Sequence, residues 1–488
     1  MADGTNGPGT RRGVIVGREA AGRPSIGFAT RPRPEGPGTA VGAPLDGHAI
    51  AIAPTGAGKL LSLVVPWTLG WPDEGSVLVV DPKGEAAAVT ARARARRGSA
   101  VHVVDPFRVS GLRPSPCNPL RFIDPDSEDL LDDARAVAEM MLPERHDVRD
   151  AFWRSRALWF VTTAIVHVMR ERKPPERTLV SVRDVVFGWA RSMRRGEQLP
   201  GAAATALKLE GDDPEVRRAA ETMELGSPET VGGILHYALE AVGFIRGEPV
   251  ERSLECGGVD FESFARGDPT TCFLVLPPHL LKTHAPLLRL WSWAFLSSVQ
   301  RRTRPPAGRT LFVVDEAAQL GHYGPLLTAV TLLRGYGLST LSLWQDGAQL
   351  RSAYPDDWRT MVNNCRTLAC FGARTDAGWR DALDTLGMAG CTRSEAEGRI
   401  LVLSDGRERL LDRIDYRTDP LFEGEFDPNP FHEADAGPIV RPRTKRRKPR
   451  RPAARPGGTR RRVDPDLARE YDAVKAQVMA LWEPEAVF

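Results

Sequence analysis

The chain has 488 residues, of which 42% are hydrophobic and 26% are charged. These proportions are ordinary for a globular protein and exclude a wholly disordered or fibrous chain, while the length predicts two or three domains. The formal net charge is +3, but residues 441–462 hold 12 Lys and Arg side chains and no acidic one. The basic character is therefore concentrated in one tail, and the rest of the chain is mildly acidic.

The cysteines and the first residues indicate the cellular compartment. Six scattered cysteines form no C-x-x-C pair, which is typical of a reduced cytosolic protein. Residues 1–47 hold 11 Gly and 6 Pro without an apolar run, so we expect a flexible leader and no secretory signal. The most apolar uncharged stretch, Ala157–Met169, has 13 residues, whereas a helix that spans a membrane needs about 20. We therefore expect no intrinsic membrane span.

From residue 48 onward, short apolar runs alternate with turns and helical segments, which is the pattern of a parallel α/β sheet. The predicted strands are residues 49–53, 76–81, 101–105, 272–276, 310–315, 338–344 and 367–371. This pattern predicts an α/β domain in two pieces, residues 48–124 and 259–428.

Between these pieces, residues 125–258 lose the strand signal and show helical periodicity. One apolar stripe consists of Leu130, Ala134, Val137, Ala138 and Met141. A second helix is strongly apolar and is expected to lie in a packed core, with Phe152, Trp153, Leu158, Trp159, Phe160 and Ile165. The sequence therefore predicts an inserted all-α domain.

The periodic pattern ends after residue 428. Residues 429–463 contain the basic run, which cannot bury enough apolar surface to fold alone, so we expect a disordered tail. Such a tail suits contact with phosphate backbones or anionic lipid, and equally a solvated linker. Residues 464–488 begin with Asp-Pro and carry apolar side chains at helical spacing, which predicts an amphipathic helix.

A phosphate-binding loop is predicted where the strand 49–53 runs into an apolar helix. Small residues allow backbone N–H groups to close around phosphates, the helix N-terminus adds its dipole, and Lys59 can reach the β and γ oxygens. The alternative is an ordinary strand-to-helix turn, but strand, loop and helix together favour a nucleotide site. The residues predicted to bind ATP are Pro54, Thr55, Gly56, Ala57, Gly58, Lys59 and Leu60.

Two positions depart from the pattern G-x-x-x-x-G-K-[ST]. Ala53 replaces the first glycine, and Leu60 replaces the hydroxyl residue that normally ligates Mg²⁺. A water, or the hydroxyl of Thr55 or Ser62, is a candidate for that coordination position. ATP hydrolysis therefore remains one of two possibilities beside nucleotide binding alone.

The second half of such a site is an apolar strand that ends in acidic residues, and Thr310–Glu316 supplies it. We expect Asp315 to hold Mg²⁺, directly or through water, and Glu316 to orient and deprotonate the attacking water. The alternative, a strand end with an acidic helix cap, becomes less favoured once the phosphate loop is considered with it.

Two further residues have candidate roles in hydrolysis. Gln345 ends the predicted strand 338–344, where its amide could sense the γ-phosphate and the water; its alternative role is to satisfy backbone groups. Arg334 lies between the two strands and is a candidate arginine finger for the γ-phosphate of a neighbouring subunit. A surface arginine in a solvated ion pair is equally consistent with the sequence.

Several stretches in order resemble the TraG-type coupling proteins of type IV secretion and conjugation. The resemblance covers residues 45–425, and it is specific as a combination although each motif alone is short. The matching segments are Ala53–Lys59, Val77–Glu85, Cys117–Leu120, Leu274–His279, Ala285–Leu290, Asp315–Gly321, Gly335–Leu338 and Gln345–Leu350.

This resemblance implies a RecA-like P-loop NTPase domain with an inserted all-α domain, assembled as a homohexameric ring that uses ATP and Mg²⁺. The implied partners are DNA, single-stranded or linked to a relaxase, and secretion-channel ATPases or membrane components. Arg334 matches a position where some family members carry an arginine that acts in trans. Family members usually have N-terminal transmembrane helices, whereas the start of this chain is rich in Gly and Pro. The expected location is therefore the cytoplasm, including the cytoplasmic face of the inner membrane.

Two other functions remain open. One is a non-hydrolysing nucleotide-binding adaptor that recruits secretion substrates, which the missing hydroxyl at Leu60 favours. The other is a nucleotide kinase, which is disfavoured by the long helical insertion and by an acidic strand end suited to water activation. Measuring ATP hydrolysis separates the adaptor from an ATP-driven motor. Phosphoryl transfer to a nucleoside monophosphate would support the kinase.

Overall fold

The computed structural model describes residues 14–20, 38–142, 151–195 and 228–432. The predicted basic tail, apart from residues 429–432, and the predicted helix 464–488 lie outside the described residues.

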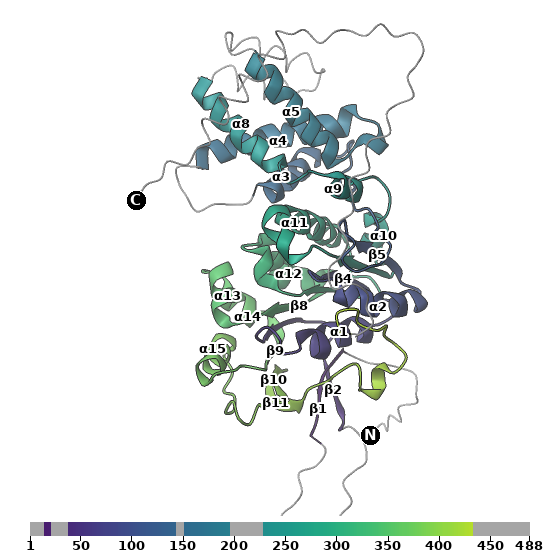
Figure 1. Ribbon diagram of the computed structural model, residues 1–488, viewed down its shortest axis with the longest axis vertical. Coiled ribbons are helices and arrows are strands. Elements are labelled where there is room, and N and C mark those ends of the chain that lie inside the picture. The colour runs from purple at the N-terminus through teal and green to yellow at the C-terminus, as the bar shows by residue number, and fades with distance from the viewer. Residues whose placement is uncertain (1–13, 21–37, 143–150, 196–227, 433–488) are drawn as a thin grey trace, which may run out of the picture. The chain divides into compact units, whose positions relative to one another are not determined.

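The described strands form one 11-stranded sheet in the order β2-β1-β11-β10-β9-β3-β8-β7-β4-β6-β5 (Figure 1). All seven predicted strands are present as β3 to β9 and pair in parallel. Their carboxyl ends therefore lie at one edge of the sheet, where ligand sites of α/β proteins form. The bounds are β3 His48–Ile52, β4 Ser76–Val80, β5 Ala100–Val104, β6 Thr270–Leu274, β7 Thr310–Val314, β8 Leu338–Trp344 and β9 Cys365–Cys370.

Four antiparallel strands that the sequence analysis did not predict extend this sheet beyond β9. They are β10 (Arg399–Ser404), β11 (Arg407–Asp412), β1 (Val14–Arg18) and β2 (Ala40–Ala43). The expectation of a flexible leader over residues 1–47 is therefore wrong for β1 and β2. Their sequences are short and contain glycine, so they show little strand signal alone. In the sheet, β1 pairs with β11 and β2 pairs with β1, which satisfies backbone groups that an isolated strand would leave open.

Helices cover both faces of the parallel strands. The bounds of all described helices, those of the helical insertion included, are α1 Val65–Gly70, α2 Glu85–Arg96, α3 Leu130–Met141, α4 Ala151–Glu171, α5 Leu179–Arg195, α8 Pro228–Val242, α9 Glu248–Ser253, α10 Phe261–Arg266, α11 Pro278–Gln300, α12 Gly324–Leu332, α13 Gly347–Ala353, α14 Trp358–Asn363 and α15 Asp376–Leu386. Alternate strand residues point to opposite faces. Ala49 and Ala51 pack with α1 and α2, whereas Ile50 and Ile52 belong to the core that contains α11 and α12.

The described residues between β5 and β6 form helices and turns without a strand, in agreement with the expected helical insertion. The apolar stripe predicted on α3 is buried at all five positions. On α4, Leu158, Phe160 and Ile165 are buried, but Phe152 and Trp159 are 52% and 38% exposed. The expectation of core packing is therefore wrong for these two aromatic side chains, which lie on the outer side of α4. The exact limits of the domain, residues 125–258, stay a prediction.

The side chain of Arg94 on α2 forms hydrogen bonds with three other segments of the chain. It is fully buried, and its guanidinium donates to the carbonyl oxygens of Trp71 and Gly75 and to the Thr271 hydroxyl at 2.8–3.1 Å. Replacing Arg94 with methionine is expected to lower the free energy of unfolding by about 3 kcal/mol, because these acceptors lose a charged donor. Urea unfolding measures this change. Arg96→Met, at an exposed position of the same helix, is the control and should change stability by less than about 0.5 kcal/mol; equal losses would contradict the prediction.

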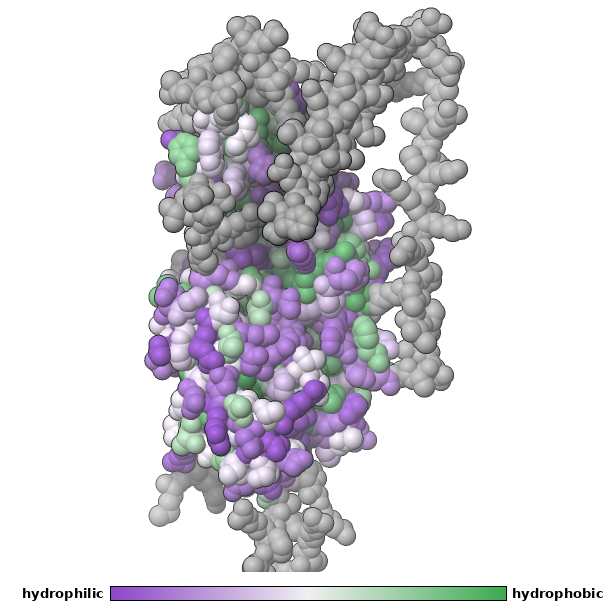
Figure 2. Space-filling view, turned by 60° about the vertical axis from the view of Figure 1, so that its left-hand side comes forward, coloured by the Kyte–Doolittle hydropathy of each residue, from purple (hydrophilic) through white to green (hydrophobic). Residues whose placement is uncertain are grey.

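Among the described residues, the helices are all too short or too polar to cross a membrane. Figure 2 shows one face of the molecule, on which hydrophilic residues predominate and hydrophobic residues form small separate groups.

Candidate functional site

The predicted phosphate loop lies at the carboxyl end of β3, between β8 and β9. The Ala53 N–H donates to the Trp344 carbonyl oxygen at 2.9 Å, and the Phe371 N–H donates to the Ile52 carbonyl oxygen at 3.2 Å, so both neighbouring strands hold the base of the loop. Gly58 has a φ of +88°, a left-handed conformation that glycine adopts without strain. The helix starts directly after the loop, with a π-helical turn that continues into α1.

The side chain of Lys59 folds back onto the start of the loop. Its side chain is 8% exposed, and its Nζ donates to the Ala53 carbonyl oxygen at 2.9 Å. The same nitrogen lies 3.6 Å from the Glu316 Oε1 atom. The structure therefore brings together Lys59 and Glu316, two predicted site residues that are more than 250 positions apart in the chain.

Glu316 follows β7 and also contacts the predicted sensor Gln345. The Gln345 Nε2 atom donates to Glu316 Oε2 at 2.6 Å, a short hydrogen bond to a charged acceptor. The Gln345 backbone N–H in turn donates to the Gln349 side chain at 3.0 Å. Glu316 has a φ of +62°, which is uncommon for a residue with a side chain. Its carboxylate is therefore held by a cation on one side and an amide on the other.

Asp315 and Asp81 directly follow the neighbouring strands β7 and β4; Asp81 is buried and Asp315 is half-buried. Burial raises the pKa of Asp315 to about 6, and the nearby Glu316 acts in the same direction. Burial also raises the pKa of Asp81 to about 7, with Asp315 contributing. The Asp315 Oδ1 atom is buried without a hydrogen-bond partner. An unsatisfied carboxylate oxygen beside the phosphate loop fits a divalent cation, which prefers such oxygen ligands.

Leu60 supplies no hydroxyl for Mg²⁺, and the nearby Ser62 hydroxyl faces Arg413. Leu60 is half-buried among apolar side chains and offers no ligand atom. The Ser62 Oγ atom accepts a hydrogen bond from Arg413 Nε at 3.4 Å and is thus turned toward that arginine. Thr55 is exposed at the start of the loop. This leaves the Thr55 hydroxyl or a water for the coordination position that the sequence pattern leaves open.

The structure does not bring Arg334 to this site. Arg334 lies just before β8, at the edge of the sheet opposite the phosphate loop. Its guanidinium donates to the backbone oxygen of Asp46 at 2.7 Å and to the Asp46 carboxylate at 3.1 Å. In the described part of the chain, Arg334 therefore lies apart from the candidate site.

Two arginines that the sequence analysis did not single out lie against the phosphate loop. Arg374, in the segment after β9, donates to the Thr55 carbonyl oxygen at 3.2 Å. Arg413, directly after β11, lies beside Gly58 and Ser62. A sequence signal existed for Arg374, because it follows a predicted strand next to the loop. No signal existed for Arg413, because β11 was not predicted.

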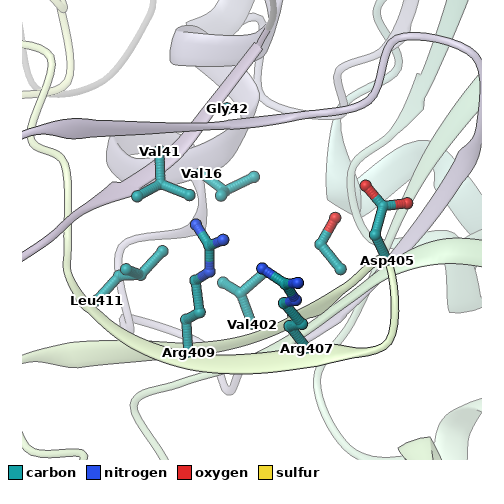
Figure 3. A pocket seen from close by; sticks show the side chains of 9 residues that line it. Val16, Val41, Gly42, Val402, Asp405, Arg407, Arg409 and Leu411 are labelled. Atoms are coloured by element: carbon teal, nitrogen blue, oxygen red, sulfur yellow. The ribbon is translucent and has the colours of Figure 1, made fainter.

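A cavity of about 270 Å³ lies among the antiparallel strands β1, β2, β10 and β11 (Figure 3). Val16 and Leu411 contribute apolar surface, and Arg407 and Arg409 of β11 lie beside them. None of the predicted site residues lines this cavity. The candidate nucleotide site stays the predicted phosphate loop.

Comparison with known protein families decides the classification. The family model described as "Type IV secretory system Conjugative DNA transfer" matches residues 22–383, most of the chain. The chain belongs to this family. Its membership confirms the resemblance to TraG-type coupling proteins that the motifs indicated.

Relatives of the Conjugative DNA transfer family support the assignment. The conjugal transfer protein TraG of Rhizobium radiobacter is 29% identical over 318 residues, which make up 63% of this chain and 47% of TraG. Protein VirD4 of the same organism is 26% identical over 315 residues, 63% of this chain and 43% of VirD4. The chain therefore spans about half the length of the curated relatives it matches.

Solved structures of this family confirm the fold. The conjugative coupling protein TrwB, in a form with sulfate, has a TM-score of 0.57 at 16% identity, over 76% of this chain and 86% of TrwB. TrwB in complex with ADP and Mg²⁺ has a TM-score of 0.53 at 15% identity, over 75% and 84%. The predicted α/β fold, with a mostly parallel sheet and a helical part, is therefore correct.

Proposed function

We propose that this chain is an ATP-hydrolysing coupling protein of a type IV secretion or conjugation system, which recruits DNA or a DNA-linked protein and drives it to the secretion channel. Membership of the Conjugative DNA transfer family supports the biological setting. The observation that carries the ATPase activity is the position of Glu316, held between Lys59 and Gln345 at the phosphate loop.

Each side chain of the site has a distinct part in this proposal. Lys59 exchanges its contact with Glu316 for phosphate oxygens of ATP, while backbone N–H groups of the loop bind the same oxygens. Glu316 is then free to accept the proton of the attacking water. Gln345 keeps the Glu316 carboxylate oriented and detects the loss of the γ-phosphate.

Asp315 is the residue that we propose for holding Mg²⁺, because its Oδ1 atom lacks a partner. The bound ion would neutralise negative charge on the phosphate oxygens. That the related TrwB has been crystallised with ADP and Mg²⁺ supports this choice of cofactors.

We also propose that the protein works as a ring, the homohexamer that the family resemblance implied, with Arg334 acting on a neighbouring subunit. Arg334 and Asp46 have side chains that are 58% and 48% exposed, and such exposed ion pairs stabilise by less than about 1 kcal/mol. Breaking the pair to reach a neighbouring phosphate therefore costs little. Such a ring would bind DNA through contacts with its phosphate backbone, independently of base sequence.

The test is steady-state ATP hydrolysis by the purified chain, with and without single-stranded DNA. We expect DNA to stimulate hydrolysis at about 50 mM salt and less at about 200 mM, because salt weakens phosphate contacts. Lys59→Ala should remove both the basal and the stimulated rate. Hydrolysis that ignores DNA at both salt concentrations would contradict a DNA-driven motor.

One observation favours a second function, a nucleotide-binding adaptor without turnover. Leu60 supplies no hydroxyl for Mg²⁺, and Ser62 is turned toward Arg413. ATP binding that is normal in affinity, with no hydrolysis under any of the conditions above, would support the adaptor.

A further inference from the structure

Arg413 is held against the end of the phosphate loop. An added Cβ at Gly58 would meet the Arg413 Nη2 atom at 2.6 Å, so the guanidinium occupies the space where a side chain would otherwise stand. The Arg413 Nε atom donates to the Ser62 hydroxyl at 3.4 Å, and the guanidinium lies 5.0 Å from the centre of the Phe371 ring. Arg413 is thus positioned by two contacts on the outer side of the loop.

Arg374 lies against the other end of the same loop. Its Nη2 atom donates to the Thr55 carbonyl oxygen at 3.2 Å and lies 3.6 Å from the position of a Cβ at Gly56. The segment that carries it is pressed onto the loop, because an added Cβ at Gly372 would lie 2.5 Å from the Ala57 Cβ atom. The side chain of Arg374 itself is exposed.

Neither arginine has a carboxylate partner among the described residues. The salt bridges of that part of the chain include neither of them. Asp415 is near enough to attract Arg413 electrostatically, but its carboxylate forms a salt bridge with Arg417. Burial lowers the pKa of Arg413, yet an arginine stays charged at neutral pH. A half-buried cation that contacts only a hydroxyl at 3.4 Å and the face of an aromatic ring is better satisfied by an anion.

We propose that Arg374 and Arg413 bind the phosphates of the nucleotide from the two ends of the loop. Guanidinium groups match phosphate oxygens in charge and geometry, and the two side chains flank the loop whose N–H groups would hold the same phosphates. This inference rests on the proposed nucleotide-binding function and adds two binding residues to it. Each arginine reaches the loop from its own subunit, in contrast to Arg334.

The experiment is an equilibrium titration of the full chain with a fluorescent ATP analogue and Mg²⁺. The Kd is expected to rise by about tenfold in Arg374→Gln and in Arg413→Gln, and further in the double variant, because each loses a charge-assisted hydrogen bond. Arg413→Lys keeps the charge without the planar fork and should lie between wild type and Arg413→Gln. The control is Arg409→Gln. Arg409 lies on β11, the strand that precedes Arg413, but its side chain lines the cavity of Figure 3. Its Kd for the ATP analogue should therefore stay within about twofold of wild type.

Thermal unfolding without nucleotide separates binding from packing. Unchanged melting temperatures with weakened binding support the proposal. A Kd within twofold of wild type in either Arg374→Gln or Arg413→Gln overturns the proposal that both arginines bind phosphate. An equal rise of the Kd in Arg409→Gln overturns it as well. If Arg413→Gln does not fold, Arg413→Lys and Arg374→Gln decide. If wild type and Lys59→Ala both fail to bind ATP, the proposed function itself fails, which is a separate result.

Discussion

Lys59→Ala is expected to weaken ATP binding by about 100-fold or more. The Lys59 ammonium is buried, and in the described chain it contacts only the Ala53 carbonyl oxygen and the Glu316 carboxylate. Both contacts leave it free to turn toward phosphate oxygens. Losing two charged hydrogen bonds of about 1.5 kcal/mol each corresponds to about 3 kcal/mol, or roughly two powers of ten in Kd. Titration with a fluorescent ATP analogue measures the change.

The matched control is Lys282→Ala, which removes an exposed lysine from α11 far along the chain from the loop. It should bind ATP as the wild type does, since a surface lysine contributes little. Binding of ATP by Lys59→Ala at wild-type affinity would show that the nucleotide does not use this loop. The assignment of the site would then have to be abandoned.

Glu316→Gln is expected to keep ATP binding while hydrolysis falls by about 100-fold or more. Glutamine has nearly the same shape and can still accept the hydrogen bond from Gln345 through its carbonyl oxygen. It cannot take a proton from water, and loss of a general base typically costs 10²- to 10⁴-fold, an order-of-magnitude range. Single-turnover hydrolysis, measured beside the binding titration, separates the two effects.

Glu262→Gln makes the same chemical change at an exposed position of α10 and should leave the hydrolysis rate unaltered. Two results would count against Glu316 as the base. One is a rate in Glu316→Gln close to that of wild type. The other is a parallel loss of ATP binding, which would mean that Glu316 serves to position Lys59.

The sequence was sufficient to predict the parallel part of the sheet and to place the candidate residues Lys59 and Glu316 at strand ends. The strands β3, β4, β6, β7 and β8 are buried along their whole length, so their apolar runs are continuous and stand out from the turns. Lys59 follows one of these strands and Glu316 another. Because parallel strands place their carboxyl ends at one edge, both residues were expected at that edge, and the observed order of the strands brings them into contact.

The antiparallel strands were missed for a physical reason. In β11, the first three residues are exposed, and β1 and β2 are short and contain glycine. Their stability comes from pairing with one another and with β10, a non-local contribution that no local pattern reveals. The same applies to Phe152 and Trp159, whose exposure depends on which side of α4 faces its neighbours.

The sequence by itself determined the chemistry at the ends of adjacent strands: the phosphate loop, the acidic pair Asp315–Glu316 and the amide of Gln345. These depend on residue type and on position at the end of an apolar run, which are local properties. Only the tertiary structure decided that Arg374 and Arg413 lie against the loop and that Arg334 lies at the opposite edge. Their places depend on how β9 and β11 pair within the sheet, and such long-range pairing is set by the packing of the whole fold.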